Sequence, residues 1–171
     1  MFLSLLQDLK TFLDKSKYGV IYISFGTNAI PSQLPPEKIQ MFVKVFSQLP
    51  YDVVWKWDKD ELPGRTENIR LSKWLPQSDL LRHSKIKLFI TQGGLQSTDE
   101  AINAGVPLLA VPLLGDQWYN AEKYVRYTIG KKVEMGTLKE VELKSAIESI
   151  IGDERYLSCI VSIFSYSVNK E

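Results

Sequence analysis

The segment Lys87–Asn120, KLFITQGGLQSTDEAINAGVPLLAVPLLGDQWYN, contains two strand-like apolar runs, and each run ends in a turn that opens a helical pattern. The first run ends at Gly93-Gly94 and the second at Asp116-Gln117. A strand-to-helix turn leaves backbone N–H groups at a helix N-terminus, which favours binding of a phosphate. The second turn offers a carboxylate beside an amide, a pair suited to vicinal hydroxyls. Together the two turns predict a nucleotide-sugar site on an α/β fold.

Strand and helix patterns alternate along the rest of the chain as well. Strands are expected at Gly19–Phe25, Asp52–Trp57, Asn68–Leu71, Lys85–Thr91, Leu108–Pro112 and Lys132–Glu134. Helices are expected at Pro36–Leu49, Ser78–Leu81, Ser97–Gly105, Asp116–Thr128 (with Gly130 past its end) and Thr137–Ile151. Two of these helices begin with a capping-box pattern, Ser97-x-x-Glu100 and Thr137-x-x-Glu140. The short connections favour a doubly wound parallel sheet, which is a Rossmann-like fold.

The two ends of the chain differ from this central domain, which we place at residues 17–155. Residues 1–16 are predicted to form an amphipathic lead-in helix, because apolar residues recur there at helical spacing: Phe2, Leu5, Leu6, Leu9, Phe12 and Leu13. This segment lacks the basic leader and cleavage site of a signal peptide. Residues 156–171 form an atypical tail, as in a truncated product. No run of 18 apolar residues occurs, so no transmembrane helix is expected.

The composition is that of a single ordinary domain. With 171 residues and a formal net charge of +1, the chain has no basic excess that would indicate binding to nucleic acid. One cysteine, Cys159, and one histidine, His83, exclude an internal disulfide and a Cys/His zinc site. We therefore expect no metal. His83 follows a short helical pattern and precedes a strand, so we do not expect it to act as a general base.

The residues around the first turn suit a diphosphate and a ribose. Gly93 and Gly94 would let the backbone approach the diphosphate, although a tight strand-to-helix turn is the plain alternative. Gln96 and Ser97 can donate hydrogen bonds to phosphate oxygens. Glu100 can accept hydrogen bonds from both ribose hydroxyls, or it can only complete the capping box that begins at Ser97.

Tryptophans offer a surface on which a base could stack. In Trp74-Leu75-Pro76-Gln77, the proline keeps Leu75 out of helical conformation, and the indole of Trp74 can either stack on a base or belong to the core. Trp55 and Trp57 share one face of a strand and are better explained as core. The Lys56 side chain then points to the other face, where a phosphate is one possible partner.

Asp116, proposed above to bind sugar hydroxyls, could instead be only the N-cap of the helix that follows it.

These motifs resemble the donor-binding signature of the UDP-glycosyltransferases, above all the insect and baculovirus members. The resemblance rests on Thr91–Ser97 (TQGGLQS), on Trp74–Gln77, on the first strand and its Gly26-Thr27 turn, and on the Asp116-Gln117 box. It departs from the commoner family pattern at Gln92, where a histidine is usual. It implies a UDP-sugar site formed by Gly26, Thr27, Trp74, Leu75, Gln77, Gln92, Gly93, Gly94, Gln96, Ser97, Glu100, Asp116, Gln117 and Asn120.

The resemblance also implies a fold and an activity. The chain would be the C-terminal, donor-binding half of a two-Rossmann (GT-B) glycosyltransferase that moves a hexose, glucose by preference, from a UDP-sugar such as UDP-glucose to a hydroxyl of a small lipophilic acceptor. The catalytic base and the acceptor pocket would belong to an N-terminal domain outside this sequence. No metal or other cofactor is implied. Full-length family members are anchored in the endoplasmic reticulum membrane or secreted.

Three other classes of protein were weighed. A nicotinamide dehydrogenase would need Gly-x-Gly-x-x-Gly after the first strand, where SFGTNAIP stands instead. A P-loop NTPase would need Lys-Ser or Lys-Thr after its glycines. The serious alternative is a non-catalytic UDP-sugar-binding module, or a truncated gene product without transferase activity.

Overall fold

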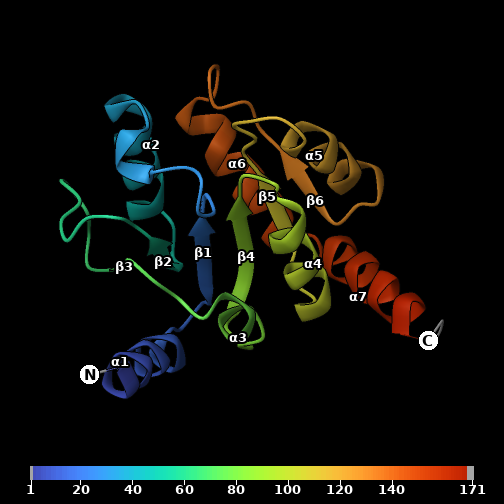
Figure 1. Ribbon diagram of the computed structural model, residues 1–171, viewed down its shortest axis with the longest axis horizontal. Coiled ribbons are helices and arrows are strands. Elements are labelled where there is room, and N and C mark those ends of the chain that lie inside the picture. The colour runs from blue at the N-terminus through green and yellow to red at the C-terminus, as the bar shows by residue number, and fades with distance from the viewer. Residues whose placement is uncertain (1, 169–171) are drawn as a thin grey trace.

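The computed structural model describes residues 2–168, apart from the side chains of residues 2–6, 164 and 166–168. Its described residues form a six-stranded parallel sheet in the order β3-β2-β1-β4-β5-β6 (Figure 1). The strands are β1 Val20–Ser24, β2 Asp52–Lys56, β3 Ile69–Ser72, β4 Ile86–Thr91, β5 Leu108–Ala110 and β6 Gly130–Lys132. The helices are α1 Phe2–Lys15, α2 Pro36–Ser47, α3 Gln77–Leu81, α4 Leu95–Ala104, α5 Gln117–Arg126, α6 Glu140–Ile151 and α7 Glu154–Val168, with a 3₁₀ turn at Pro31–Gln33.

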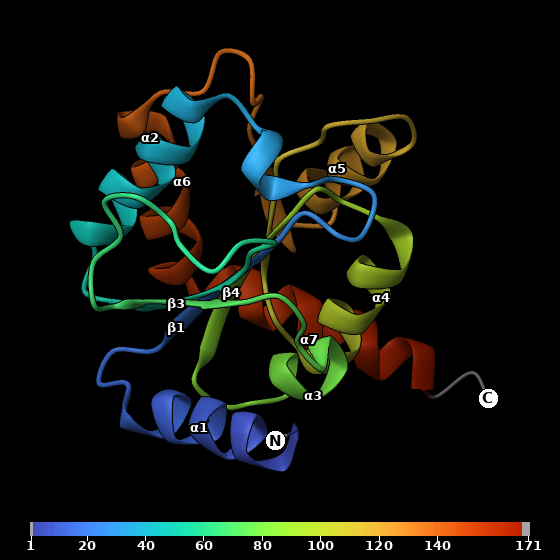
Figure 2. The same ribbon diagram turned by 60° about the vertical axis from the view of Figure 1, so that its left-hand side comes forward.

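Helices cover both faces of the sheet, as the alternating pattern predicts. Successive strand residues point to opposite faces, so Ile21 and Ile23 pack under α2 and α6 in one apolar cluster that also holds the buried Trp55. Tyr22 points the other way, into a second cluster shared with α1, α3, α4, α5 and α7, where its ring stacks on Phe89 at 4.7 Å. Figure 2 shows α2 and α6 on one side of the sheet and α1, α3, α4 and α7 on the other.

The strand order places a topological switch point between β1 and β4. The chain builds outward from β1 through β2 to β3, and it then returns to β4 on the other side of β1. Ile23 therefore lies beside Trp55 of β2 and beside Ile90 of β4. In an open α/β sheet the loops leaving two such strands diverge and leave a crevice at their carboxyl ends, which is where ligands bind.

The predicted elements are all present, but both capping boxes are wrong. Helix α4 begins at Leu95 with Gly94 as its N-cap, so Ser97 is its third residue and Glu100 its sixth. Helix α6 begins at Glu140 with Lys139 as its N-cap, so Thr137 lies outside the helix. Gly94 adopts an ordinary extended conformation (φ −65°, ψ 142°), so α4 begins without a side-chain cap.

Several boundaries also differ from the expected ones. Strand β5 ends at Ala110 rather than Pro112, and helix α5 ends at Arg126. Gly130, expected just past a helix end, instead opens β6, which ends at Lys132 and so lies earlier than the predicted strand. A Cβ at Gly130 would collide with the Leu108 carbonyl oxygen, so β6 can pair with β5 only because this residue has no side chain.

The two ends of the chain are helical. In α1 the predicted positions Leu9 and Leu13 are buried against the sheet and Phe12 packs beside them, while the side chains of Phe2, Leu5 and Leu6 lie outside the described residues. Helix α7 begins at Glu154 and contributes the buried Ile160, so the boundary proposed at residue 156 falls inside one helix. Within the described chain, every helix is too short or too polar to cross a bilayer.

Candidate functional site

A cavity of about 290 Å³ opens at the carboxyl ends of β1 and β4. It brings together nine of the predicted site residues: Gly26, Thr27, Leu75, Gln77, Gln92, Gly94, Gln96, Ser97 and Glu100. Lys56, weighed from the sequence as a possible phosphate ligand, also lines it, as do Tyr22 and Leu95, which the sequence did not single out. The remaining predicted residues, Trp74, Gly93, Asp116, Gln117 and Asn120, lie outside this lining. The cavity occupies the crevice that the strand order predicts.

The N-terminus of α4 forms one wall of the cavity. Leu95, Gln96 and Ser97 are its first three residues, and all three line the cavity. The first N–H groups of a helix have no acceptor within the helix, and the helix dipole adds a partial positive charge there. This wall therefore favours an anion such as a phosphate.

The preceding turn is held in place by buried polar groups. Gly93 has a φ of +93°, and a Cβ there would lie 3.1 Å from the Gln117 carbonyl oxygen, so the turn requires glycine. The Asn120 amide donates to the Gly93 carbonyl oxygen at 2.9 Å, and the Thr98 hydroxyl donates to the Gly94 carbonyl oxygen at 2.9 Å. Both carbonyl groups of the turn are thus tied to protein donors.

The turn after β1 forms the opposite wall. Gly26 has a φ of +79°, and a Cβ at this position would collide with the carboxamide of Gln92. The Lys56 ammonium donates to the Gly26 carbonyl oxygen at 3.1 Å and brings a positive charge to the cavity. The Gln92 side-chain oxygen is buried and has no hydrogen-bond partner among the described residues. Gln92 therefore has an unused acceptor at the junction of the two turns.

A hydrogen-bonded chain of side chains crosses the floor of the cavity. The Tyr22 hydroxyl donates to the side-chain oxygen of Gln77 at 2.9 Å. The Gln77 amide nitrogen donates to the Ser97 hydroxyl oxygen at 3.0 Å and to the Glu100 carboxylate at 2.7 Å. Gln96 donates to the second carboxylate oxygen of Glu100 at 3.3 Å. Glu100 is therefore an acceptor for side chains of the site and not part of a capping box.

The second predicted turn lies beside the cavity, and two of its residues are used structurally. The Gln117 side-chain oxygen accepts hydrogen bonds from the backbone N–H groups of Leu113 and Leu114, both at 2.8 Å. Gln117 and Asn120 are both buried. Asp116 is exposed, and its carboxylate accepts a hydrogen bond from the Asn120 amide at 3.5 Å. Of the Asp116-Gln117 pair, the carboxylate is thus the more available group.

Trp74 is not a core residue, so that alternative is wrong. Its side chain is 52% exposed, whereas Trp55 is fully buried in the core and Trp57 nearly so, as their alternation predicted. The Ser72 hydroxyl donates to the Trp74 carbonyl oxygen at 2.6 Å, and the buried Leu75 connects Trp74 to the cavity. Trp74 is not in the lining of this cavity; it borders a separate, smaller cavity, and Leu75 lines both.

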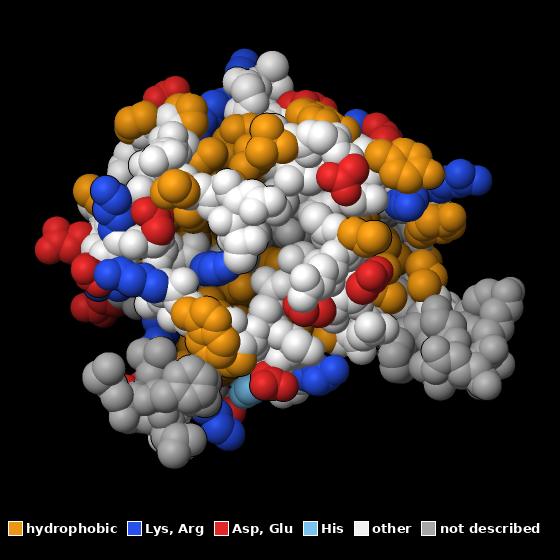
Figure 3. All heavy atoms as spheres, viewed as in Figure 1, with side chains coloured by type: hydrophobic (Ala, Val, Ile, Leu, Met, Phe, Trp, Pro, Cys, Tyr) orange, Lys and Arg blue, Asp and Glu red, His pale blue; other side chains and the backbone are white. Residues whose placement is uncertain are grey.

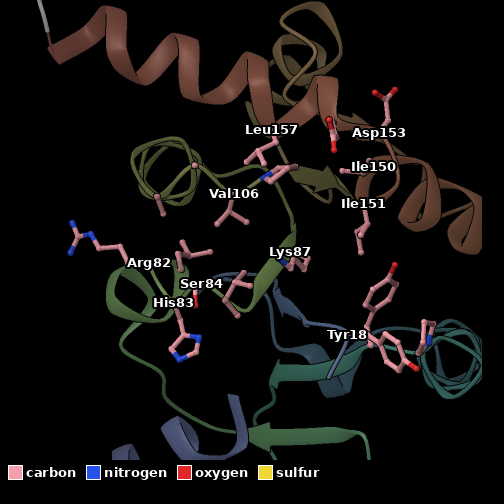
Figure 4. A pocket seen from close by; sticks show the side chains of 18 residues that line it. Tyr18, Arg82, His83, Ser84, Lys87, Val106, Ile150, Ile151, Asp153 and Leu157 are labelled. Atoms are coloured by element: carbon pink, nitrogen blue, oxygen red, sulfur yellow. The ribbon is translucent and has the colours of Figure 1, made fainter. Parts of the chain in front are cut away.

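A larger cavity, of about 500 Å³, lies at the opposite, amino end of the sheet (Figure 4). It is lined by residues such as Tyr18, Lys87, Val106 and Asp153 and by His83, whose ring nitrogen Nε2 lies 3.1 Å from the Asp14 carboxylate. None of the predicted site residues borders it. His83 is therefore remote from the carboxyl-end cavity.

Charged groups in the described chain do not converge on a metal site. No cluster of three or more His, Cys, Asp or Glu side chains that could hold a metal occurs among the described residues. Asp58 and Asp60 stand two apart after β2, but Asp58 accepts hydrogen bonds from Ser32 and Asp60 pairs with Lys73. Figure 3 shows acidic, basic and apolar side chains intermixed on one face of the molecule, in keeping with a net charge near zero.

Comparison with known sequences identifies relatives over nearly the whole chain. The sequence profile of the family described as "UDP-glucoronosyl and UDP-glucosyl transferase" matches residues 4–168, beyond residue 156, where we expected family-like sequence to stop. The chain is 41% identical over 154 residues to an ecdysteroid UDP-glucosyltransferase of Spodoptera littoralis nuclear polyhedrosis virus, covering 87% of this chain and 29% of the relative. It is 37% identical over 150 residues to UDP-glycosyltransferase UGT5 of Dactylopius coccus, covering 88% of this chain and 28% of that relative.

Solved structures agree with this result. The glycotransferase of kitacinnamycin aligns with 88% of this chain and 39% of its own, with a TM-score of 0.77 and 26% identity. The calicheamicin glycosyltransferase aligns with 90% of this chain and 40% of its own, with a TM-score of 0.76 and 22% identity. At this identity the comparison shows likeness of fold alone. The fold is that of the C-terminal half of a GT-B glycosyltransferase. The chain spans less than a third of the length of the curated relatives named above.

Proposed function

Because the chain belongs to the UDP-glycosyltransferase family, we propose that its carboxyl-end cavity binds the nucleotide part of a UDP-sugar. The observation that carries this proposal is the convergence of the α4 N-terminus, Lys56 and Glu100 on one cavity. The first two groups attract a diphosphate, and the carboxylate accepts hydrogen bonds from ribose hydroxyls. A site for phosphate alone would have no use for the carboxylate.

Each part of the nucleotide has a proposed contact. The diphosphate lies against the first N–H groups of α4, with further donors from Gln96, Ser97 and Lys56. The ribose hydroxyls bind Glu100. The uracil stacks on the exposed indole of Trp74, and the main chain of Leu75 binds its polar edge. The hexose extends toward Asp116.

The reaction proposed for the complete enzyme is direct displacement at the sugar. The acceptor hydroxyl oxygen forms a bond to the anomeric carbon, while the bond from that carbon to the diphosphate oxygen breaks. The electron pair stays on the departing UDP, and the hydroxyl proton goes to a base supplied by residues outside this sequence. The α4 N-terminus and Lys56 stabilise the negative charge that develops on the diphosphate. The acceptor is a small lipophilic molecule with a hydroxyl, and the donor is UDP-glucose.

Calorimetry with two variants tests the binding assignment. Glu100→Gln should weaken UDP and UDP-glucose alike, because both carry the ribose, whereas Asp116→Asn should weaken only UDP-glucose. A lost hydrogen bond to a charged group corresponds to about 1.5–3 kcal/mol, which is roughly a 10- to 100-fold change in Kd. Unchanged UDP affinity in Glu100→Gln would disprove the ribose assignment.

Turnover by the purified chain tests the alternative of a non-catalytic module. The chain spans only 29% of its viral relative, and the residues lining the cavity include no histidine. We expect the 171-residue chain to bind UDP without transferring glucose from UDP-glucose to phenols or sterols. Transfer by this chain alone would show that the base lies within it and would refute this part of the proposal.

A further inference from the structure

The strongest unassigned feature of the described chain is the buried phenol beneath the carboxyl-end cavity. Tyr22 lies on the central strand β1, and its side chain is fully buried. A tyrosine in the middle of an apolar strand normally serves only as core, yet this hydroxyl reaches Gln77, a residue 55 positions away that lines the site. Burial raises the pKa of the Tyr22 phenol well above its usual value, so the group keeps its proton.

The proton arrangement of this chain is determined by its two ends. The Glu100 carboxylate can only accept, so the Gln77 amide must present its NH₂ group to Glu100. Its oxygen then faces Tyr22, which must donate. The reverse orientation of the amide would place its oxygen against the carboxylate. Glu100 therefore selects the orientation of the Gln77 amide, and the hydrogen bond from the Tyr22 hydroxyl holds the amide oxygen in that orientation.

The oriented Gln77 amide determines how Ser97 and Glu100 can hydrogen-bond: Ser97 as a donor and Glu100 as an acceptor. Its NH₂ group donates to the Ser97 oxygen, which leaves the Ser97 hydroxyl proton available for another acceptor. The same NH₂ group donates to Glu100. A carboxylate has about four acceptor positions, and Gln77 and Gln96 use two of them. The remaining positions match a pair of vicinal hydroxyls.

We propose that Tyr22 is a positioning residue, which acts through Gln77 to hold Glu100 as the acceptor for the ribose hydroxyls and Ser97 as a donor to phosphate. This inference rests on the proposed UDP site. It assigns part of the discrimination of the ribose 2′-hydroxyl to Tyr22, which lines the cavity and acts through its hydrogen bond to Gln77. Through this contact, a side chain buried in the core of the sheet affects which nucleotide the site prefers.

The test compares the affinities of UDP and 2′-deoxy-UDP by calorimetry. The unmodified chain should prefer UDP by about tenfold, the loss expected for one hydrogen bond to a carboxylate. Tyr22→Phe keeps the ring that stacks on Phe89 and removes only the hydroxyl, and this preference should fall to about threefold or less. Gln77→Leu should have the same effect, and the double variant should lose no more than either single one, because both changes break one path.

Tyr124→Phe is the matched control. Tyr124 is a second fully buried tyrosine of the same core cluster, hydrogen-bonded to Thr98 and outside the cavity lining. The Tyr124→Phe variant should lower the free energy of unfolding without changing the ratio of the UDP and 2′-deoxy-UDP affinities. If the unmodified chain binds UDP with preference over 2′-deoxy-UDP and Tyr22→Phe keeps that preference, the positioning role is refuted while the UDP site stands. If the unmodified chain binds both ligands equally, the ribose assignment and the positioning role fall together. Absence of UDP binding refutes the proposed function itself.

Discussion

Replacing Trp74 by alanine tests whether this side chain contributes to UDP binding or to the stability of the fold. The Trp74 side chain is 52% exposed, so its removal takes little apolar surface out of the core. By contrast, Trp55 is fully buried among Phe42, Phe46 and Trp57. Truncating a buried tryptophan costs about 3–5 kcal/mol, whereas Trp74→Ala should change the free energy of unfolding by less than about 1 kcal/mol.

The expected effect of Trp74→Ala on binding is much larger. Stacking of a base on an aromatic ring is worth about 1–3 kcal/mol, so UDP affinity should fall roughly 10- to 100-fold. Trp74→Phe should keep part of this affinity, because a smaller aromatic ring still stacks. Tryptophan emission should respond to UDP in the unmodified chain and lose that response in Trp74→Ala. Calorimetry and thermal melting on the same samples provide both quantities.

Trp118 supplies the matched control. It is also exposed, at 38%, and lies on α5 outside the lining of the cavity. Trp118→Ala should leave both the melting temperature and UDP affinity nearly unchanged. A Trp74→Ala protein that melts much lower yet binds UDP normally would refute the stacking role, and the nucleotide assignment would then rest on the α4 N-terminus, Lys56 and Glu100.

Two further predictions concern buried groups near the site. Asn120→Leu removes the donor to the Gly93 carbonyl oxygen, so it should lower the free energy of unfolding by about 1–3 kcal/mol and also weaken UDP binding. Asp116 is exposed, so Asp116→Ala should change the free energy of unfolding little. Equal urea midpoints for the two variants would contradict this prediction. Burial raises the pKa of Tyr124 to about 12, above the value near 10 in the unfolded chain. The unfolded chain therefore loses this proton at lower pH than the folded protein does, and the stability that the protonated Tyr124 contributes is complete below about pH 9 and is lost as the pH rises. Between pH 9 and 11 this loss should amount to about 1 kcal/mol, and Tyr124→Phe should reduce the measured pH dependence of unfolding by that amount.

The sequence predicts the fold well because the signals for it are local. Alternation of buried strands and amphipathic helices yields the six strands and their flanking helices, and short connections favour the parallel arrangement. Helix starts were less predictable. Ser97 and Glu100 have the spacing of a capping box, but Gly94 is the N-cap, so the helix begins at Leu95, two residues before the expected start. A local pattern cannot reveal which of two adjacent starts the tertiary contacts select.

The sequence predicts nine of the residues that line the carboxyl-end cavity, but it does not predict which polar side chains pair across the fold. Glycines, Ser97 and Glu100 are recognisable because the motif that carries them is contiguous. Tyr22 was missed because a tyrosine in an apolar strand resembles core, and its partner Gln77 is 55 positions away. Asn120 was expected at the sugar, yet its amide is buried against the Gly93 carbonyl oxygen, 27 positions away. Pairings across such distances follow from the folded sheet and not from residue spacing.

The polar groups around the Gly93-Gly94 turn explain how a phosphate could be bound with a single lysine in the cavity lining. A backbone carbonyl pointing into the cavity would repel a phosphate. Asn120 and Thr98 bind the two carbonyl groups of the turn through side-chain donors, while the first residues of α4 line the cavity. The turn that precedes this helix N-terminus is thus fixed by the protein itself, as the proposed diphosphate site requires.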